Sequence, residues 1–208
     1  MDNTKSIKEE KKINTSIDTV FFDEKGDTIK SQTANLKNNY ELIIFPALDK
    51  KSEGVINFRL ITDKKDNTYL LASTFQANRR PYYKGIDFQN YFALHSNGGG
   101  TSKFYFWLYC KAAGEEIFKG IELDFDLKNE LILYEDEDND YNLFIYDVNT
   151  KVKTLIELPY DVMFKQECTK YNDSYKSIYI KRVTKEYYYF GFKDCEPLSI
   201  EFKVRKAK

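Results

Sequence analysis

The chain has 208 residues, the size of one typical domain and enough to bury a substantial core. Hydrophobic residues make up 42% and charged residues 31%, which excludes a disordered chain, and the formal net charge of -1 argues against nucleic acid or a membrane surface as the partner. The 17 Tyr and 16 Phe, against only 4 Pro, favour a β-sheet protein.

The first residues are polar and rich in Lys and Glu, so we expect a flexible segment at residues 1–16 and a single all-β domain at residues 17–208. Such a segment is typical of a mature lipoprotein tether whose signal peptide and anchoring Cys are replaced by an initiator Met. The frayed N-terminus of a cytoplasmic protein has the same composition. Two locations therefore stay open: periplasmic or membrane-tethered through a lipid anchor, and cytoplasmic.

The first half of the chain predicts strands separated by turns rich in Asp, Asn, Gly and Lys, at residues 17–22, 40–45, 54–62, 68–75 and 88–95. We expect the second of these strands to end at Pro46, and residues 28–39 to hold a loop or a short helix. KFYFWLYC, at residues 103–110, is apolar at nearly every position, which predicts a strand covered on both faces. SNGGG, at residues 96–100, predicts a hairpin loop, because a phosphate-binding loop would open a helix instead.

The second half predicts a short strand at residues 117–118 and further strands at residues 120–127, 131–134, 142–146, 153–158, 177–183, 186–192 and 198–204. In GIELDFDL, at residues 120–127, apolar and acidic residues alternate, so Glu122, Asp124 and Asp126 are expected to share one face. No stretch keeps an apolar period of 3.6 residues, so helices should be few and short. The sequence therefore predicts an all-β meander of sequential antiparallel strands, arranged as a β-sandwich or as an incomplete, propeller-like stack.

Residues 131–158, LILYEDEDNDYNLFIYDVNTKVKTLIEL, resemble one blade hairpin of a WD40-type or TolB-type β-propeller. The WD dipeptide and the structural GH of those repeats are absent, so the resemblance implies an antiparallel meander rather than a closed propeller. The stretch at residues 91–120, together with that hairpin, is similar in style to small secreted or lipid-anchored proteins of the Bacteroidota. Its sequence is YFALHSNGGGTSKFYFWLYCKAAGEEIFKG. Some of those proteins are immunity proteins against interbacterial toxins. The similarity implies such a role but assigns no residues to it.

Signals for catalysis are weak. His95 is the only histidine, so His-based catalysis and most zinc sites would depend on one residue at a strand end, where a structural role is expected. The three cysteines, Cys110, Cys168 and Cys195, lack a metal-binding spacing and predict either three reduced thiols or one Cys168–Cys195 disulfide. We therefore expect a protein that is not an enzyme and needs no cofactor.

The strongest local feature is EDEDND at residues 135–140, which we call the acidic turn. From Glu115 to Asp147, twelve acidic residues accompany two lysines, a local net charge of −10. We expect the turn and the acidic strand face before it to bind a basic protein partner, through Glu122, Asp124, Asp126, Glu135, Asp136, Glu137, Asp138 and Asp140. Asp136, Asp138 and Asp140 are also spaced like calcium ligands, with Asn142 as a further candidate. The Gly and bidentate Glu of an EF-hand are missing, which favours a solvated turn.

RRPYYK, at residues 79–84, combines Arg79, Arg80, Tyr82 and Tyr83. Cations beside aromatic rings bind acidic protein or carbohydrate by ion pairing and stacking, or they pack inward as part of an ordinary loop.

These features predict a non-catalytic protein-binding module of the immunity type, which neutralises a bacterial toxin through an acidic, tyrosine-rich surface. Two alternatives stay open. One is a carbohydrate-binding or envelope lipoprotein module that stacks the tyrosines of RRPYYK on sugar. The other is a hydrolase that uses a pair of carboxylates.

Overall fold

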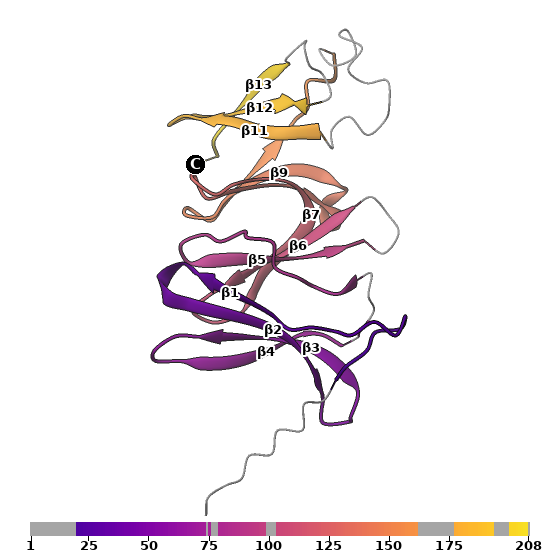
Figure 1. The fold of residues 1–208 in the computed structure, drawn as a ribbon. Coiled ribbons are helices and arrows are strands. Elements are labelled where there is room, and N and C mark those ends of the chain that lie inside the picture. The colour runs from indigo at the N-terminus through magenta and orange to yellow at the C-terminus, as the bar shows by residue number, and fades with distance from the viewer. Residues whose placement is uncertain are drawn as a thin grey trace, which may run out of the picture.

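The computed structural model describes residues 20–73, 75, 79–98, 103–161, 177–193 and 200–207. These residues form thirteen antiparallel strands in three sheets, and every pairing joins strands that follow one another in the chain. The sheets are stacked as three layers, from the N-terminal sheet at the bottom of Figure 1 to the C-terminal sheet at the top. The predicted all-β meander of antiparallel strands is therefore confirmed.

The first sheet contains β1 (Gln32–Leu36), β2 (Tyr40–Leu48), β3 (Gly54–Ile61) and β4 (Asp66–Ala72). The middle sheet contains β5 (Tyr91–Asn97), β6 (Phe104–Cys110), β7 (Glu116–Asp126), β8 (Leu131–Asp136), β9 (Asn142–Asp147) and β10 (Val152–Ile156). The third sheet contains β11 (Ile178–Val183), β12 (Tyr187–Phe192) and β13 (Glu201–Arg205). Helical structure in the described residues is limited to short pieces such as the 3-10 turns η1 (Lys37–Asn39) and η3 (Glu137–Asn139).

The N-terminal region differs from the sequence prediction. Strand β1 lies where a loop or short helix was expected, and its polar sequence reflects an edge strand in which only Leu36 is buried. Strand β2 continues through Pro46, because β1 reaches only as far as Ile44 and the missing N–H of Pro46 faces no β1 residue. The described part of the strand expected at residues 17–22 forms only an isolated bridge between Phe22 and Thr28.

Strand β7 is one long strand where two were expected. Its first half pairs with β6 as far as Ile121, and its second half, from Ile121 onward, pairs with β8. The middle sheet therefore consists of two halves that share this strand, and it is strongly curved (Figure 1). Gly120 lies at the change of partner. A Cβ atom there would lie 2.5 Å from Cδ2 of Tyr134 and 3.1 Å from Cε1 of Phe106, so the glycine makes room for both rings.

Three buried clusters fill the spaces between and within the layers. The first lies between the first sheet and β5–β6 and includes Phe58, Phe92 and Tyr109. The second is formed by the middle sheet itself, where Phe106 of β6 and Tyr134 of β8 meet edge to face at 5.8 Å between ring centroids. The third joins β8–β10 to the third sheet. The two faces of the middle sheet thus bury different clusters, and β6, the strand predicted to be covered on both faces, lies between β5 and β7.

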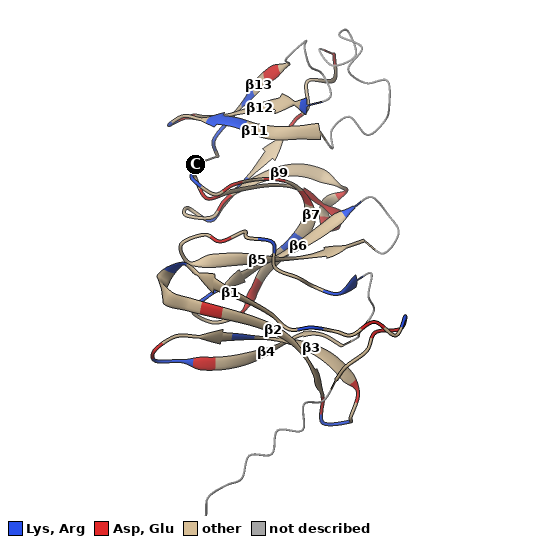
Figure 2. Cartoon of the chain, in the orientation of Figure 1, with Lys and Arg blue, Asp and Glu red and all other residues tan. Residues whose placement is uncertain are grey.

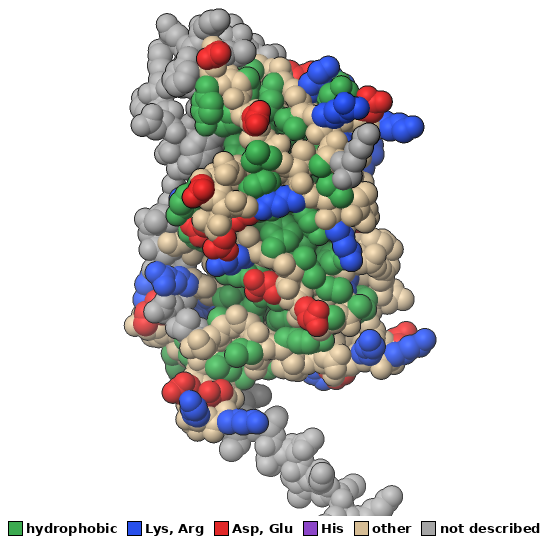
Figure 3. Space-filling model, turned by 180° about the vertical axis from the view of Figure 1, so that it is seen from behind, with side chains coloured by type: hydrophobic (Ala, Val, Ile, Leu, Met, Phe, Trp, Pro, Cys, Tyr) green, Lys and Arg blue, Asp and Glu red, His purple; other side chains and the backbone are tan. Residues whose placement is uncertain are grey.

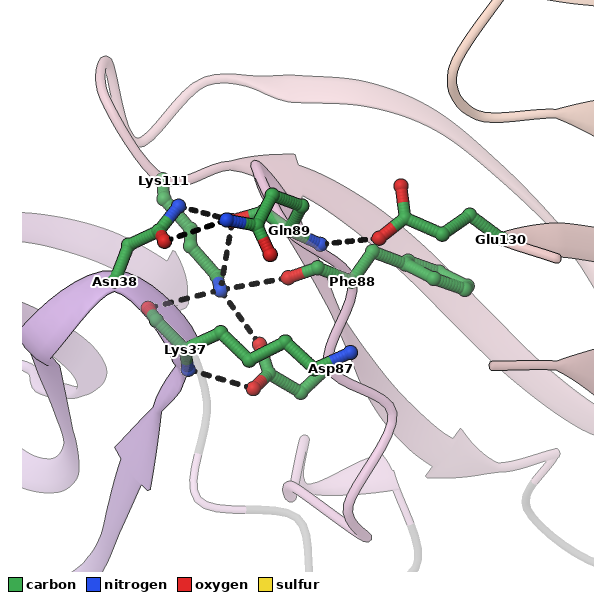
Figure 4. A network of polar contacts seen from close by, with 7 residues as sticks. All are labelled: Lys37, Asn38, Asp87, Phe88, Gln89, Lys111 and Glu130. Carbon is green, nitrogen blue, oxygen red and sulfur yellow. Dashed lines mark hydrogen bonds and ion pairs between the residues drawn. The ribbon is translucent and has the colours of Figure 1, made fainter. Parts of the chain in front are cut away.

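A buried lysine connects the first two layers (Figure 4). The Nζ atom of Lys111 lies 2.6 Å from Oδ1 of Asp87 and donates to the carbonyl oxygen of Phe88 at 2.7 Å. The other carboxylate oxygen of Asp87 accepts the backbone N–H of Lys37, in η1, at 2.7 Å. Burial lowers the pKa of Lys111, although Asp87 opposes that shift. This network fixes η1, the segment before β5 and the end of β6 relative to one another.

No helix in the described ranges is long and apolar enough to cross a membrane. Cys110 is a free thiol. Cys168 and Cys195 lie outside the described residues, so both alternatives, reduced thiols and a Cys168–Cys195 disulfide, stay predictions.

Candidate functional site

The three acidic residues of β7 do not share one face, and this prediction is wrong. A β-bulge lies between Glu122 and Asp124, and such a bulge re-aims the side chains that follow it. Glu122 points to His95, 2.9 Å from its Nδ1 atom, and forms an ion pair with Lys84. Asp124 instead accepts the backbone N–H of Ile180, in the third sheet, at 2.8 Å. Asp126 accepts two backbone N–H groups in the β7–β8 turn and therefore stabilises that turn.

The carboxylates of the acidic turn are mostly engaged within the molecule. Glu135 is buried. Asp136 accepts the N–H of Asp138 at 3.1 Å and forms an ion pair with Lys153. Glu137 accepts the hydroxyl of Tyr105 at 2.9 Å and lies 4.0 Å from Nζ of Lys103. Asp138 and Asp140 remain exposed. Acidic and basic residues are scattered over all three sheets in Figure 2.

The acidic turn has no geometry for a calcium ion in the part of the chain that the structure describes. Asp136 is already bound to Lys153 and to the N–H of Asp138. No group of three or more His, Cys, Asp or Glu side chains among the described residues is arranged to hold a metal ion. Calcium would need at least six oxygen ligands, so Asp136, Asp138 and Asp140 alone do not provide a site.

His95 is fully buried in the middle sheet. Its ring packs edge to face on Phe125, and its Nδ1 atom lies 2.9 Å from the Glu122 carboxylate. Burial lowers the pKa of His95, while the bond to Glu122 opposes the shift. The pKa of Glu122 is lowered because its bonds to His95 and Lys84 outweigh the effect of its burial. A neutral, enclosed imidazole that donates from Nδ1 to a carboxylate has the structural role that the sequence predicts.

We expect the stability of the protein to fall as the pH drops through the ordinary pKa of histidine, about 6.5. Because the pKa of His95 is lower in the folded state, the unfolded chain takes up a proton that the folded chain refuses. The slope from this residue is at most about 1.4 kcal/mol per pH unit, and its effect is absent above pH 7. Urea unfolding across this pH range should show a weaker dependence for His95→Gln. Equal slopes for both proteins would contradict a buried, neutral His95.

Two hollows flank the acidic turn. The tyrosine hollow has a volume of about 480 Å³ and is lined by Glu116, Ile117, Phe118, Lys119, Tyr134, Asp136, Asp138, Tyr146 and Lys153. The tryptophan hollow has a volume of about 350 Å³ and is lined by Arg79, Ser96, Asn97, Gly98, Tyr105, Trp107, Lys119 and Glu137. Phe118 and Trp107 pack against clusters on opposite faces of the middle sheet. The acidic turn and Lys119 therefore form the rim between two hollows, one on each face.

The first half of β7 has a free edge at this rim. Residues 116–120 pair with β6 on one side, whereas β8 begins its pairing only at Ile121. Among the described residues, no strand pairs with the other side of this segment. A bulge in the pairing with β6 includes Ile117, whose side chain is 43% exposed. On one face of the molecule, hydrophobic side chains reach the surface between acidic and basic ones (Figure 3). The backbone N–H and C=O groups on this side of residues 116–120 are therefore available to hydrogen-bond a strand from a partner.

The RRPYYK cluster is divided by the structure. Tyr82 extends the middle sheet beyond β5, because its N–H and that of His95 each donate to the other's carbonyl at 2.8 Å. Tyr83 is partly buried, which raises its pKa to about 12, and its N–H donates to Gln32. Arg80 lines a separate hollow beside β2 and β3. Of this cluster, only the exposed Arg79 lines the tryptophan hollow, which Glu137 of the acidic turn also lines.

Several residues of the site were not predicted from the sequence, above all Trp107, Lys119 and Ile117. Their signal was present in the interruption of an apolar and acidic strand by Gly120, which marks the change of partner along β7. Without knowledge of which strand ends first, the free edge beside this glycine could not be recognised.

Carboxylate-based hydrolysis gains no support from the described geometry. A general acid needs a carboxyl group with a raised pKa in a substrate cleft. Burial raises the pKa of Asp124, but this residue contacts the β11 backbone and lines neither hollow.

Comparisons with protein-family models, with curated proteins and with solved structures find no match to this chain.

Proposed function

We propose that the protein is a non-catalytic module that binds an extended segment of a protein partner along the free edge of β7. The observation that carries this proposal is the segment at residues 116–120, which pairs with β6 on one side, has no partner strand on the other side among the described residues, and lies between two hollows. An extended segment added to a sheet edge gains affinity from backbone hydrogen bonds and specificity from pockets for alternate side chains.

The two hollows suit such a segment because successive side chains of a strand point to opposite faces. One set of side chains would enter the tyrosine hollow, and the other would enter the tryptophan hollow. Trp, Tyr and Arg, which dominate binding energy in protein interfaces, line these hollows as Trp107, Tyr105, Tyr146 and Arg79. The exposed side chains of Ile117 and Tyr141 add apolar area beside them.

Charge favours a partner segment with basic residues. The exposed acidic residues near the edge are Glu116, Asp138 and Asp140. Lys119 is the exposed cation between them. Because it repels other cations, it restricts where along the edge a basic side chain of the partner can lie. Together with the resemblance in style to small Bacteroidota proteins, some of which are immunity proteins, this charge supports a toxin with a basic surface as the partner class.

Replacing Ile117 with lysine should weaken partner binding at least about tenfold, because a lysine on a sheet edge opposes strand addition. Leu70→Lys is the matched control. Leu70 is also an exposed aliphatic residue, 65% exposed, on the edge strand β4 of the first sheet. The partner that co-purifies with the full chain would be titrated against both variants by calorimetry, after thermal unfolding shows that both are folded.

Unchanged binding by Ile117→Lys, or an equal loss with Leu70→Lys, would refute the edge of β7 as the binding site.

A carbohydrate module is the second candidate, because Trp107 and Tyr105 stand beside Asn97 and Arg79 in the tryptophan hollow. A glycan bound in that hollow would be retained by Ile117→Lys.

A further inference from the structure

The tyrosine hollow already holds a cation of the chain itself. The Nζ atom of Lys153 lies 3.7 Å from the ring centroid of Phe144 and 5.7 Å from that of Tyr134. It also forms an ion pair with Asp136. An ammonium group over aromatic faces and beside a carboxylate is stabilised by both interactions.

Space for a second cation remains beside Lys153. The rest of the hollow is walled by Phe118 and Tyr146, whose ring centroids are 4.8 Å apart. Glu116 and Asp138 also line it, and neither forms an ion pair among the described residues. Lys119 is the opposing cation at the rim. The unpaired carboxylates thus exceed the unpaired cations by one in this part of the hollow.

We infer that the tyrosine hollow binds a basic side chain of the partner, with a guanidinium group preferred over an ammonium group. This inference rests on the proposed function, because the side chain belongs to the segment bound at β7. A guanidinium group is planar and weakly hydrated, so it stacks on aromatic rings while it donates to carboxylates such as Asp138. Lys153 occupies part of the same aromatic surface and competes with the guest.

The binding chemistry can be tested without the partner. N-acetyl-arginine amide and its neutral analogue, N-acetyl-citrulline amide, are titrated into the ¹⁵N-labelled full chain, and backbone amide shifts are followed. The arginine probe is expected to shift residues 116–119 and 136–138 and to bind at least about tenfold more tightly than citrulline. Asp138→Asn should weaken binding of the arginine probe several-fold. Asp140→Asn is the matched control, because Asp140 is exposed in the same turn but does not line the hollow.

Lys153→Met should strengthen binding of the arginine probe, since it frees Asp136 and the ring of Phe144. Lys103→Met is the matched control, because it removes the same charge beside Glu137 but outside the hollow, and a nonspecific acidic surface would respond equally to both variants. Equal binding of both probes, equal losses in Asp138→Asn and Asp140→Asn, or no shifts at high millimolar arginine probe would each overturn the inference. If the arginine probe fails while Ile117→Lys still abolishes partner binding, the edge of β7 is retained and the cation site is rejected.

Discussion

Replacing Lys111 with methionine is expected to lower the free energy of unfolding by about 3–5 kcal/mol, which is typical when one partner of a buried ion pair is removed. Methionine fills a similar volume, so the loss reflects the charge and its hydrogen bonds. The Asp87 carboxylate would lose its cation, and the carbonyl groups of Phe88 and Gln89 would lose a donor. Chemical denaturation of both proteins, followed by circular dichroism, measures this difference.

Lys119→Met is the matched control for this prediction. Lys119 is an exposed lysine on the adjacent strand β7, where the same substitution should change stability by less than about 0.5 kcal/mol. The double variant Lys111→Met, Asp87→Leu should be more stable than the sum of the two single losses predicts, because the substitutions remove both charges of one pair. Additive losses, or a Lys111→Met variant as stable as the control, would show that the network in Figure 4 does not connect the layers.

Gly120→Val should cost about 2–3 kcal/mol, a large penalty for overpacking a core. The first added carbon would already lie 2.5 Å from the ring of Tyr134, and the backbone oxygen of Glu135 is 3.3 Å away on another side. The ring of Tyr134 is packed against Phe106 and Phe118, so it cannot move aside without disturbing the cluster within the middle sheet. Thermal and urea unfolding of the variant measure the cost.

A second substitution separates the packing clash from loss of backbone freedom. Tyr134→Leu shortens the side chain that the new Cβ atom would meet, so the double variant Gly120→Val, Tyr134→Leu should recover part of the lost stability. If the two losses simply add, the glycine is needed for a reason other than the ring of Tyr134.

The strands that the sequence predicts correctly are those whose apolar pattern is local. The strands predicted at residues 103–110 and 186–192 match β6 and β12 to within one residue. Strand β1 was missed because QTANL is polar and becomes a strand only through pairing with β2. The join between the two halves of β7 was missed because it depends on which residues of β6 and β8 stand opposite Gly120 and Ile121.

The candidate site shows the same limit. The acidic turn was recognisable from its composition, and it does lie at the rim of both hollows. The neutralisation of Asp136 by Lys153 and of Glu137 by Lys103 was not predictable, because both lysines come from distant segments of the chain. Glu122 and Asp124 were predicted to share one face of β7, but a β-bulge between them turns them to different faces. A bulge leaves no mark in a sequence that otherwise alternates regularly.

Amide hydrogen exchange at residues 116–120, with and without the bound partner, tests the proposed binding along β7 most directly. If a partner segment adds to this edge, the exposed N–H groups on its free side become hydrogen-bonded, and exchange at alternate residues should slow at least about tenfold. Amides of the same segment that already pair with β6 should change little. Unchanged exchange along this edge while the partner is bound, with protection instead at β4 or β13, would contradict the proposal.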